Sequence, residues 1–90
     1  MTHKDEINQL TPVQIRKRLK MTQRQASALL GVRPQTVSEW ERGVSMPNVL
    51  MLPKIVEVYQ CTADEVIIAF RNIHLMRQQA ESSIDDALSN

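Results

Sequence analysis

The sequence has little of several residue types on which other classes of protein depend. It contains one cysteine, Cys61, two glycines and three aromatic residues in 90. A single cysteine forms no intramolecular disulfide, so a reducing compartment, the cytoplasm, is expected. The densest apolar runs, at residues 49–52 and 66–70, fall far short of the roughly 20 residues that span a bilayer, and residues 1–6 lack the apolar segment of a signal peptide. We therefore expect neither a secreted nor a membrane protein.

An excess of charge of one sign is also lacking. Eleven Lys and Arg residues against ten Asp and Glu residues leave a net charge of +1, which by itself gives no indication of nucleic acid. The charges are nevertheless unevenly distributed. Residues 1–54 carry nine cations and four anions, whereas residues 55–90 carry two cations and six anions. A basic half and an acidic half are typical of a protein with a DNA-binding face and a separate partner surface.

Residues for catalysis or metal binding are missing from the sequence as well. It has no Ser-His-Asp set and no glycine-rich phosphate loop, and His3 and His74 lie far apart without a ligand spacing. We therefore expect no enzyme, no metal site and no cofactor. The length fits one small domain, and a chain of this size buries only about 60% of its unfolded surface, which favours a second copy as a partner.

Capping signals divide the chain into helices. A hydroxyl residue three positions before Gln or Glu occurs at Thr11–Gln14, Thr22–Gln25 and Thr62–Glu65, and a weaker signal begins at Ser83. No hairpin dipeptide separates alternating apolar runs, so an all-α fold is favoured. Five helices are expected, near residues 12–20, 23–30, 34–42, 53–59 and 63–80.

The second and third expected helices carry most of the functional information. Gly31 ends one and Pro34 begins the other, and so short a connection predicts a steep crossing, the helix-turn-helix, with the small residues 26–28 at the crossing point. Gly43 ends the third helix. The apolar positions expected to face the core are Leu30, Val32, Val37 and Trp40. The polar positions on the opposite face are Gln35, Thr36, Ser38, Glu39 and Arg42.

A set of motifs in order resembles the Cro/CI-type, or XRE-like, helix-turn-helix domains of phage repressors. It consists of Arg16, Thr22-Gln23, Ser27, Gly31-Val32, Val37-Ser38, Glu41-Arg42-Gly43, Pro47 and the segment 61–66. The resemblance covers residues 12–67 and implies a five-helix, lambda-repressor-like fold. We expect a flexible tail over 1–10, the DNA-binding domain over 11–69 and a helical extension over 70–90.

The resemblance also implies a role for individual residues, with the third helix in the major groove of DNA. The residues expected to read bases are Arg33, Gln35, Thr36, Ser38 and Glu39. The residues expected to contact phosphates are Gln23, Arg24 and Arg42. Arg16 and Glu41 are expected to form a structural ion pair between the first and third helices. The chain departs from the family where Arg33 replaces the usual hydroxyl cap and Ala26 a leucine.

Other residues have plainer interpretations. Trp40 and Tyr59 lie on apolar helix faces and are expected in the core, and Cys61 is expected to act as a small hydrophobe. The basic run at residues 17–20 fits a solvated helix face or DNA-backbone contacts equally well.

These expectations combine into a sequence-specific regulator of transcription that binds double-stranded DNA. We expect it to repress by occlusion, as a homodimer on a palindromic operator. The dimer is expected to form through the C-terminal helix, where apolar residues recur at Val66, Phe70, Ile73, Ala80, Ile84 and Ala87, interrupted by Arg77. The alternative is a protein-binding module, such as a DNA-binding antitoxin, whose acidic C-terminal tail holds a protein partner.

Overall fold

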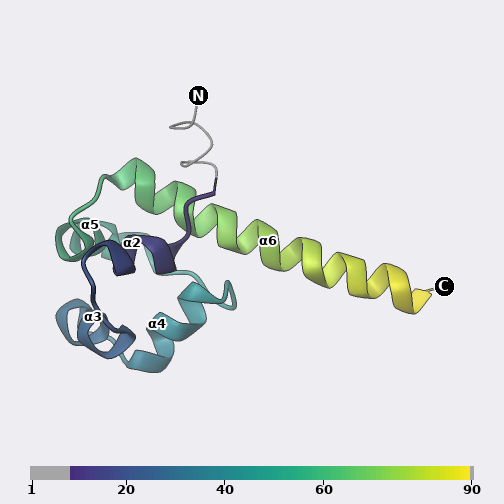
Figure 1. Cartoon of the computed structure of the whole chain (residues 1–90), viewed down its shortest axis with the longest axis horizontal. Helices are drawn as coiled ribbons and strands as arrows, with labels where there is room; N and C mark the ends of the chain where they lie inside the picture. Colours follow the sequence, from purple (N-terminus) through teal and green to yellow (C-terminus); the bar gives the residue numbers. More distant parts are fainter. Residues whose placement is uncertain (1–8, 90) are drawn as a thin grey trace.

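The predicted all-α fold is confirmed by the computed structural model, which describes the backbone of residues 9–89 and the side chains of residues 9–81. Nearly all of the expected flexible tail lies outside these described residues. Every regular element within them is helical (Figure 1). The elements are α2 (Pro12–Arg18), α3 (Gln23–Leu30), α4 (Pro34–Glu41), the 3₁₀ helix η1 (Val49–Met51), α5 (Leu52–Tyr59) and α6 (Ala63–Ser89).

The three strong capping signals all form capping boxes. At the start of α3, Thr22 Oγ1 accepts a hydrogen bond from the Gln25 amide at 3.0 Å, and Gln25 Oε1 accepts one from the Thr22 amide at 2.8 Å. Thr11 and Thr62 are paired in the same way at the starts of α2 and α6. The weaker signal at Ser83 is wrong, because α6 runs through this position to Ser89. No Gly or Pro follows residue 53 to interrupt the helix there.

Most helix ends agree with the sequence, and the differences have local causes. Gly31 and Gly43 both take the left-handed conformation expected of them, with φ of +74°. α2 stops at Arg18, two residues before the expected end, because Lys20 also has a positive φ, +57°. The 3₁₀ turn before α5 was not expected. It begins at Asn48, whose Oδ1 accepts a hydrogen bond from the Leu50 amide at 2.8 Å.

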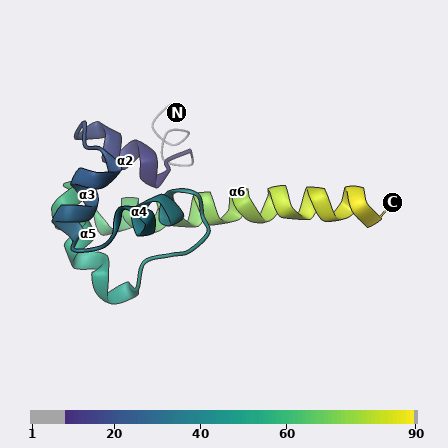
Figure 2. The ribbon, with the colours of Figure 1, turned by 90° about the horizontal axis from the view of Figure 1, so that it is seen from below.

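The hydrophobic core lies where α2, α3, α4 and α5 gather around the first half of α6 (Figures 1 and 2). Trp40 and Tyr59 are buried in it as predicted, and the Trp40 ring meets Phe70 edge to face with ring centroids 6.1 Å apart. Cys61 packs at its margin as a half-buried small hydrophobe, and burial raises the pKa of its thiol.

The core also reaches past both expected domain boundaries. Leu10, assigned to the tail, is buried, and its carbonyl accepts a hydrogen bond from Asn72 Nδ2 at 2.9 Å. Phe70, expected to begin the extension, is buried as well. The folded domain therefore includes the third turn of α6.

The rest of α6 extends away from the other helices in both views (Figures 1 and 2). With 27 residues the helix is about 40 Å long, so roughly half of it lies beyond the core. Leu75 and Met76, at the start of this projecting half, are 40% and 54% exposed. In the part of the chain that the structure describes, no helix is long and apolar enough to cross a membrane.

Candidate nucleic-acid interface

The turn between α3 and α4 brings the two helices into close contact. Ala26 and Ser27 on α3 are buried at the crossing, and Ser27 Oγ donates a hydrogen bond to the Arg24 carbonyl at 2.7 Å, so its hydroxyl is satisfied inside the packed interface. Ala28, the third small residue expected there, is instead exposed. It lies on the outer side of α3, because successive helical residues are rotated by about 100°.

A buried polar network ties α2, α3 and α4 together. Arg16 Nε donates to Glu41 Oε2 at 2.6 Å and Nη2 to Glu41 Oε1 at 3.0 Å, which is a bidentate pair between α2 and α4. Gln23 Nε2, from the first turn of α3, donates to Glu41 Oε1 at 2.9 Å. Arg16 Nη1 donates to the Met21 carbonyl at 2.7 Å in the connection between α2 and α3. The sequence did not predict that Gln23 joins this network.

Glu41 and the burial of this region shift the pKa values of two neighbouring groups, Arg16 and Tyr59. The hydrogen bond to Glu41 raises the pKa of Arg16, and burial raises the pKa of nearby Tyr59 to about 12, with a further contribution from the Glu41 charge. Arg16 and Glu41 therefore pair through a bidentate contact in a largely buried setting. Because the network joins the last residue of α4 to α2 and to the start of α3, it fixes the orientation of α4 relative to those two helices.

The polar face of α4 is the part of the helix that the core leaves uncovered. Gln35 is exposed, and Thr36, Ser38 and Glu39 are half-buried along the same side. Two of the expected site residues are brought together, since Arg42 Nε donates to Ser38 Oγ at 3.3 Å. Val37, on the opposite side of the helix, is fully buried.

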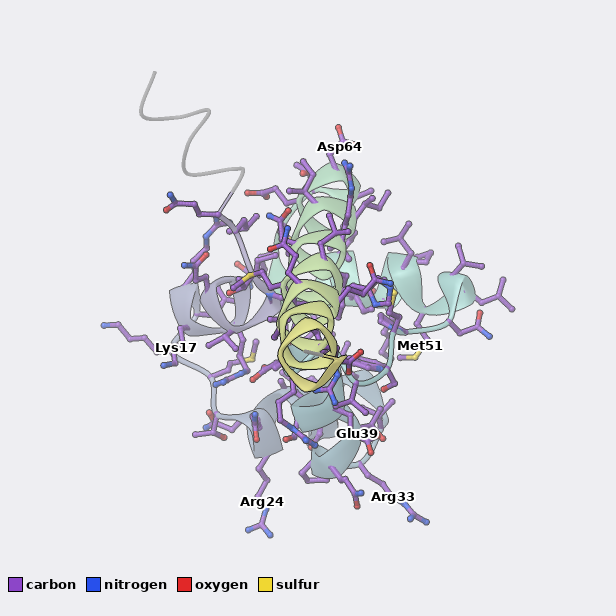
Figure 3. The ribbon with its side chains drawn as sticks, turned by 90° about the vertical axis from the view of Figure 1, so that its right-hand side faces the viewer. Lys17, Arg24, Arg33, Glu39, Met51 and Asp64 are labelled. Carbon is purple, nitrogen blue, oxygen red and sulfur yellow. The ribbon has the colours of Figure 1, made fainter. Side chains whose placement is uncertain are left out.

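Two arginines mark the edge of the domain next to this face. Figure 3 shows Arg24 on α3 and Arg33 at the start of α4 extending from the same edge, whereas Asp64 lies at the opposite edge. Arg33 occupies the N-cap position of α4 but makes no side-chain capping bond, and Pro34 follows it within the first turn. A guanidinium carries only donors and cannot accept from the amides of the first turn, and the Arg33 side chain extends outward.

The basic run of α2 is used differently. Arg18 Nη1 pairs with Glu65 Oε2 of α6 at 2.9 Å, so this cation joins two helices of the fold. Lys17 extends sideways from α2 (Figure 3). Sequence alone left open which of these cations serves the fold, because Glu65 lies 47 residues from Arg18.

The family model described as Helix-turn-helix matches residues 14–66, more than half of the chain. The chain belongs to the XRE-type helix-turn-helix family. The match includes every residue expected at the interface, and with the all-helical structure it confirms the Cro/CI-type resemblance and the lambda-repressor-like fold. No curated protein and no solved structure matches the chain. As an XRE-type helix-turn-helix protein it is a DNA-binding regulator of transcription, in which α4 is the second, recognition helix of the motif.

Proposed function

We propose that this helix-turn-helix regulator acts in the cytoplasm as a sequence-specific repressor and occludes a palindromic operator to which it binds as a dimer. The observation that carries the proposal is the two-sided character of α4. Its apolar side and its last residue, Glu41, are anchored in the domain, while its polar side remains uncovered beside Arg24 and Arg33. A rigid helix with an uncovered polar face and cations beside it suits the major groove of DNA.

Base reading is assigned to the uncovered face of α4. Gln35 is the principal reader, because it is exposed in the first turn and an amide pairs bidentately with adenine. Arg33 has the reach and geometry for guanine, and Glu39 accepts from cytosine N4. Thr36 and Ser38 supply shorter polar contacts along the same side.

Phosphate binding is assigned to the residues around this face. Arg24 extends from α3, the helix that crosses the DNA backbone in this motif, and Arg42 follows the last turn of α4. Gln23 lies at the N-terminus of α3. Its side-chain amide nitrogen carries two hydrogens, of which the bond to Glu41 uses one. The other hydrogen is available to a DNA phosphate, and this contact would fix the register of the protein on the duplex.

Duplexes selected from a random pool by the purified full chain test this function. We expect saturable binding to a palindrome with half-sites about one helical turn apart, weakening steeply with salt. Gln35→Ala should relax the choice at one base pair of each half-site, whereas Arg24→Ala should weaken all sequences alike and lower the salt slope by about 1. Gln78→Ala, an exposed glutamine on α6, is the matched control. An equal loss on every sequence from Gln35→Ala would refute its assignment as a base reader.

The projecting half of α6 supports the proposed homodimer, because an isolated helix with apolar residues exposed at Leu75 and Met76 gains stability from a partner. Truncation after His74 keeps every core residue and removes Leu75 and Met76, unlike a cut at residue 69, which would also remove buried Phe70. We expect the full chain to be a dimer by light scattering and the truncated chain a monomer. A dimer of unchanged mass after truncation contradicts the proposal. A stable complex with a co-expressed basic protein, in place of the homodimer, would favour the antitoxin class.

A further inference from the structure

The end of the recognition helix lies directly against the backbone of α6. A Cβ atom built on Gly43, just after α4, would lie 2.9 Å from the Ile73 carbonyl oxygen and 3.3 Å from its carbon. Both atoms belong to the backbone of a continuous helix and have little freedom to move. Side chains larger than hydrogen would therefore force α4 and α6 apart at this point.

Arg77, one turn further along α6, extends the contact. Its Nη1 lies 3.4 Å from the carbonyl of Arg42, the C-cap residue of α4, to which it donates, and its Nε donates to Glu81 Oε1 at 3.1 Å. Glu81, one turn on, thus holds the guanidinium near the C-terminal end of α4. That end carries the partial negative charge of the helix dipole, so a cation is favourable there.

We propose that Arg77 is a positioning residue for DNA recognition, which acts by holding the C-terminal end of α4 against α6 rather than by touching DNA. α4 has eight residues and is about 12 Å long, so displacing its C-terminal end changes the direction of the helix that carries Gln35. The inference rests on the proposed function of α4 as the base-reading helix. α6, the helix proposed to form the homodimer, would therefore also hold the recognition helix α4 in position.

The two glycines offer a matched comparison for the close approach. Both have φ of +74°, so alanine at either position introduces the same left-handed strain. A Cβ on Gly31 meets nothing within 4 Å, whereas a Cβ on Gly43 meets the backbone of α6. We expect Gly43→Ala to lower affinity for the selected duplex at least fivefold more than Gly31→Ala, measured below the unfolding transition of each variant. Equal losses would overturn the role of the close approach.

Arg77 itself is tested with Arg77→Ala, Arg77→Lys and the control Arg71→Ala, which removes an exposed cation from the same helix. We expect Arg77→Ala to lower affinity for the selected duplex about tenfold and to reduce discrimination against a scrambled duplex. The slope of log affinity against log salt should stay unchanged, because no phosphate contact is lost. Arg77→Lys, which keeps a cation and a donor, should recover at least half of the loss on a logarithmic scale.

The other outcomes are equally decisive. A salt slope lower by about 1 would make Arg77 a phosphate ligand and overturn the inference. An affinity loss matched by a lower urea midpoint would make it a merely structural residue. Amide hydrogen exchange without DNA gives an independent readout, in which Arg77→Ala should speed exchange at Arg42 and Gly43 about fivefold and Arg71→Ala should not. Wild-type affinity in Arg77→Ala overturns the inference alone, whereas failure of the wild-type chain to select any duplex overturns the proposed function.

Discussion

Replacing Glu41 by alanine should strongly destabilise the protein. The change removes both carboxylate oxygens from a buried arginine, so that Nε and Nη2 of Arg16 lose their acceptors at once. Removing one partner of a buried pair costs about 3–5 kcal/mol, because the remaining charge stays away from water. We expect about 3 kcal/mol, since Arg16 keeps its bond to the Met21 carbonyl.

That loss is large for a chain of this size. A stability of roughly 0.05–0.15 kcal/mol per residue gives about 5–14 kcal/mol for 90 residues, so about a fifth or more would be lost. The melting temperature should fall by about 12–24 °C. Trp40, the single tryptophan and only 4% exposed, reports unfolding in urea by its fluorescence, from which the free energy is obtained by linear extrapolation.

The double variant Arg16→Met/Glu41→Leu tests whether the loss of stability comes from an unpaired buried charge or from the absence of the ion pair itself. It removes the charges together, so we expect its stability to lie within about 1 kcal/mol of the wild type, because neither buried ion remains. The exposed pair Arg18–Glu65 is the control, and its removal should cost less than about 1 kcal/mol. A cost below about 1 kcal/mol for Glu41→Ala would refute the assignment of a buried, stabilising pair.

Two further predictions follow from the helix termini. Thr22→Ala should cost about 1 kcal/mol in urea unfolding, because it removes the oxygen that caps the Gln25 amide, while Thr36→Ser should change stability little. The hydrogen bonds from Arg18 and from the Thr62 backbone lower the pKa of Glu65, so Glu65 stabilises the fold above its unfolded-state value of 4.5 and this contribution is lost as the pH falls through the folded-state value. As the pH falls below 4.5 the wild type should therefore lose stability more steeply than Glu65→Gln, by less than about 1 kcal/mol, and parallel pH profiles would contradict this reasoning.

The sequence was sufficient to predict the start or end of a helix where the physical cause lies within a few residues. A threonine and a glutamine or glutamate three residues apart bond to each other's backbone regardless of the rest of the chain, so the starts of α2, α3 and α6 were predictable. Glycine tolerates positive φ, so the ends at Gly31 and Gly43 were predictable as well. Lys20 takes the same conformation without glycine, and α2 therefore ends earlier than the sequence indicated.

The contacts of the candidate site likewise divide into those that the sequence indicated and those that only the structure showed. The resemblance to the family supplied the pair Arg16 and Glu41, and the helical pattern of polar and apolar residues supplied the polar face of α4. It did not supply the bond from Gln23 to Glu41 or the bond from Arg77 to the Arg42 carbonyl, which join residues 18 and 35 positions apart. Spacing patterns describe neighbours along one helix, and these contacts depend on how separate helices pack.

By itself the sequence determined that the protein is all-helical, where three of its helices begin, and that it carries the helix-turn-helix of a DNA-binding regulator. Only the tertiary structure decided that Leu10 and Phe70 belong to the core, that α6 continues beyond it, and that α6 touches the end of the recognition helix at Gly43. Caps and turns are set within a few residues, whereas burial and the close approach of two helices exist only once the whole chain has packed.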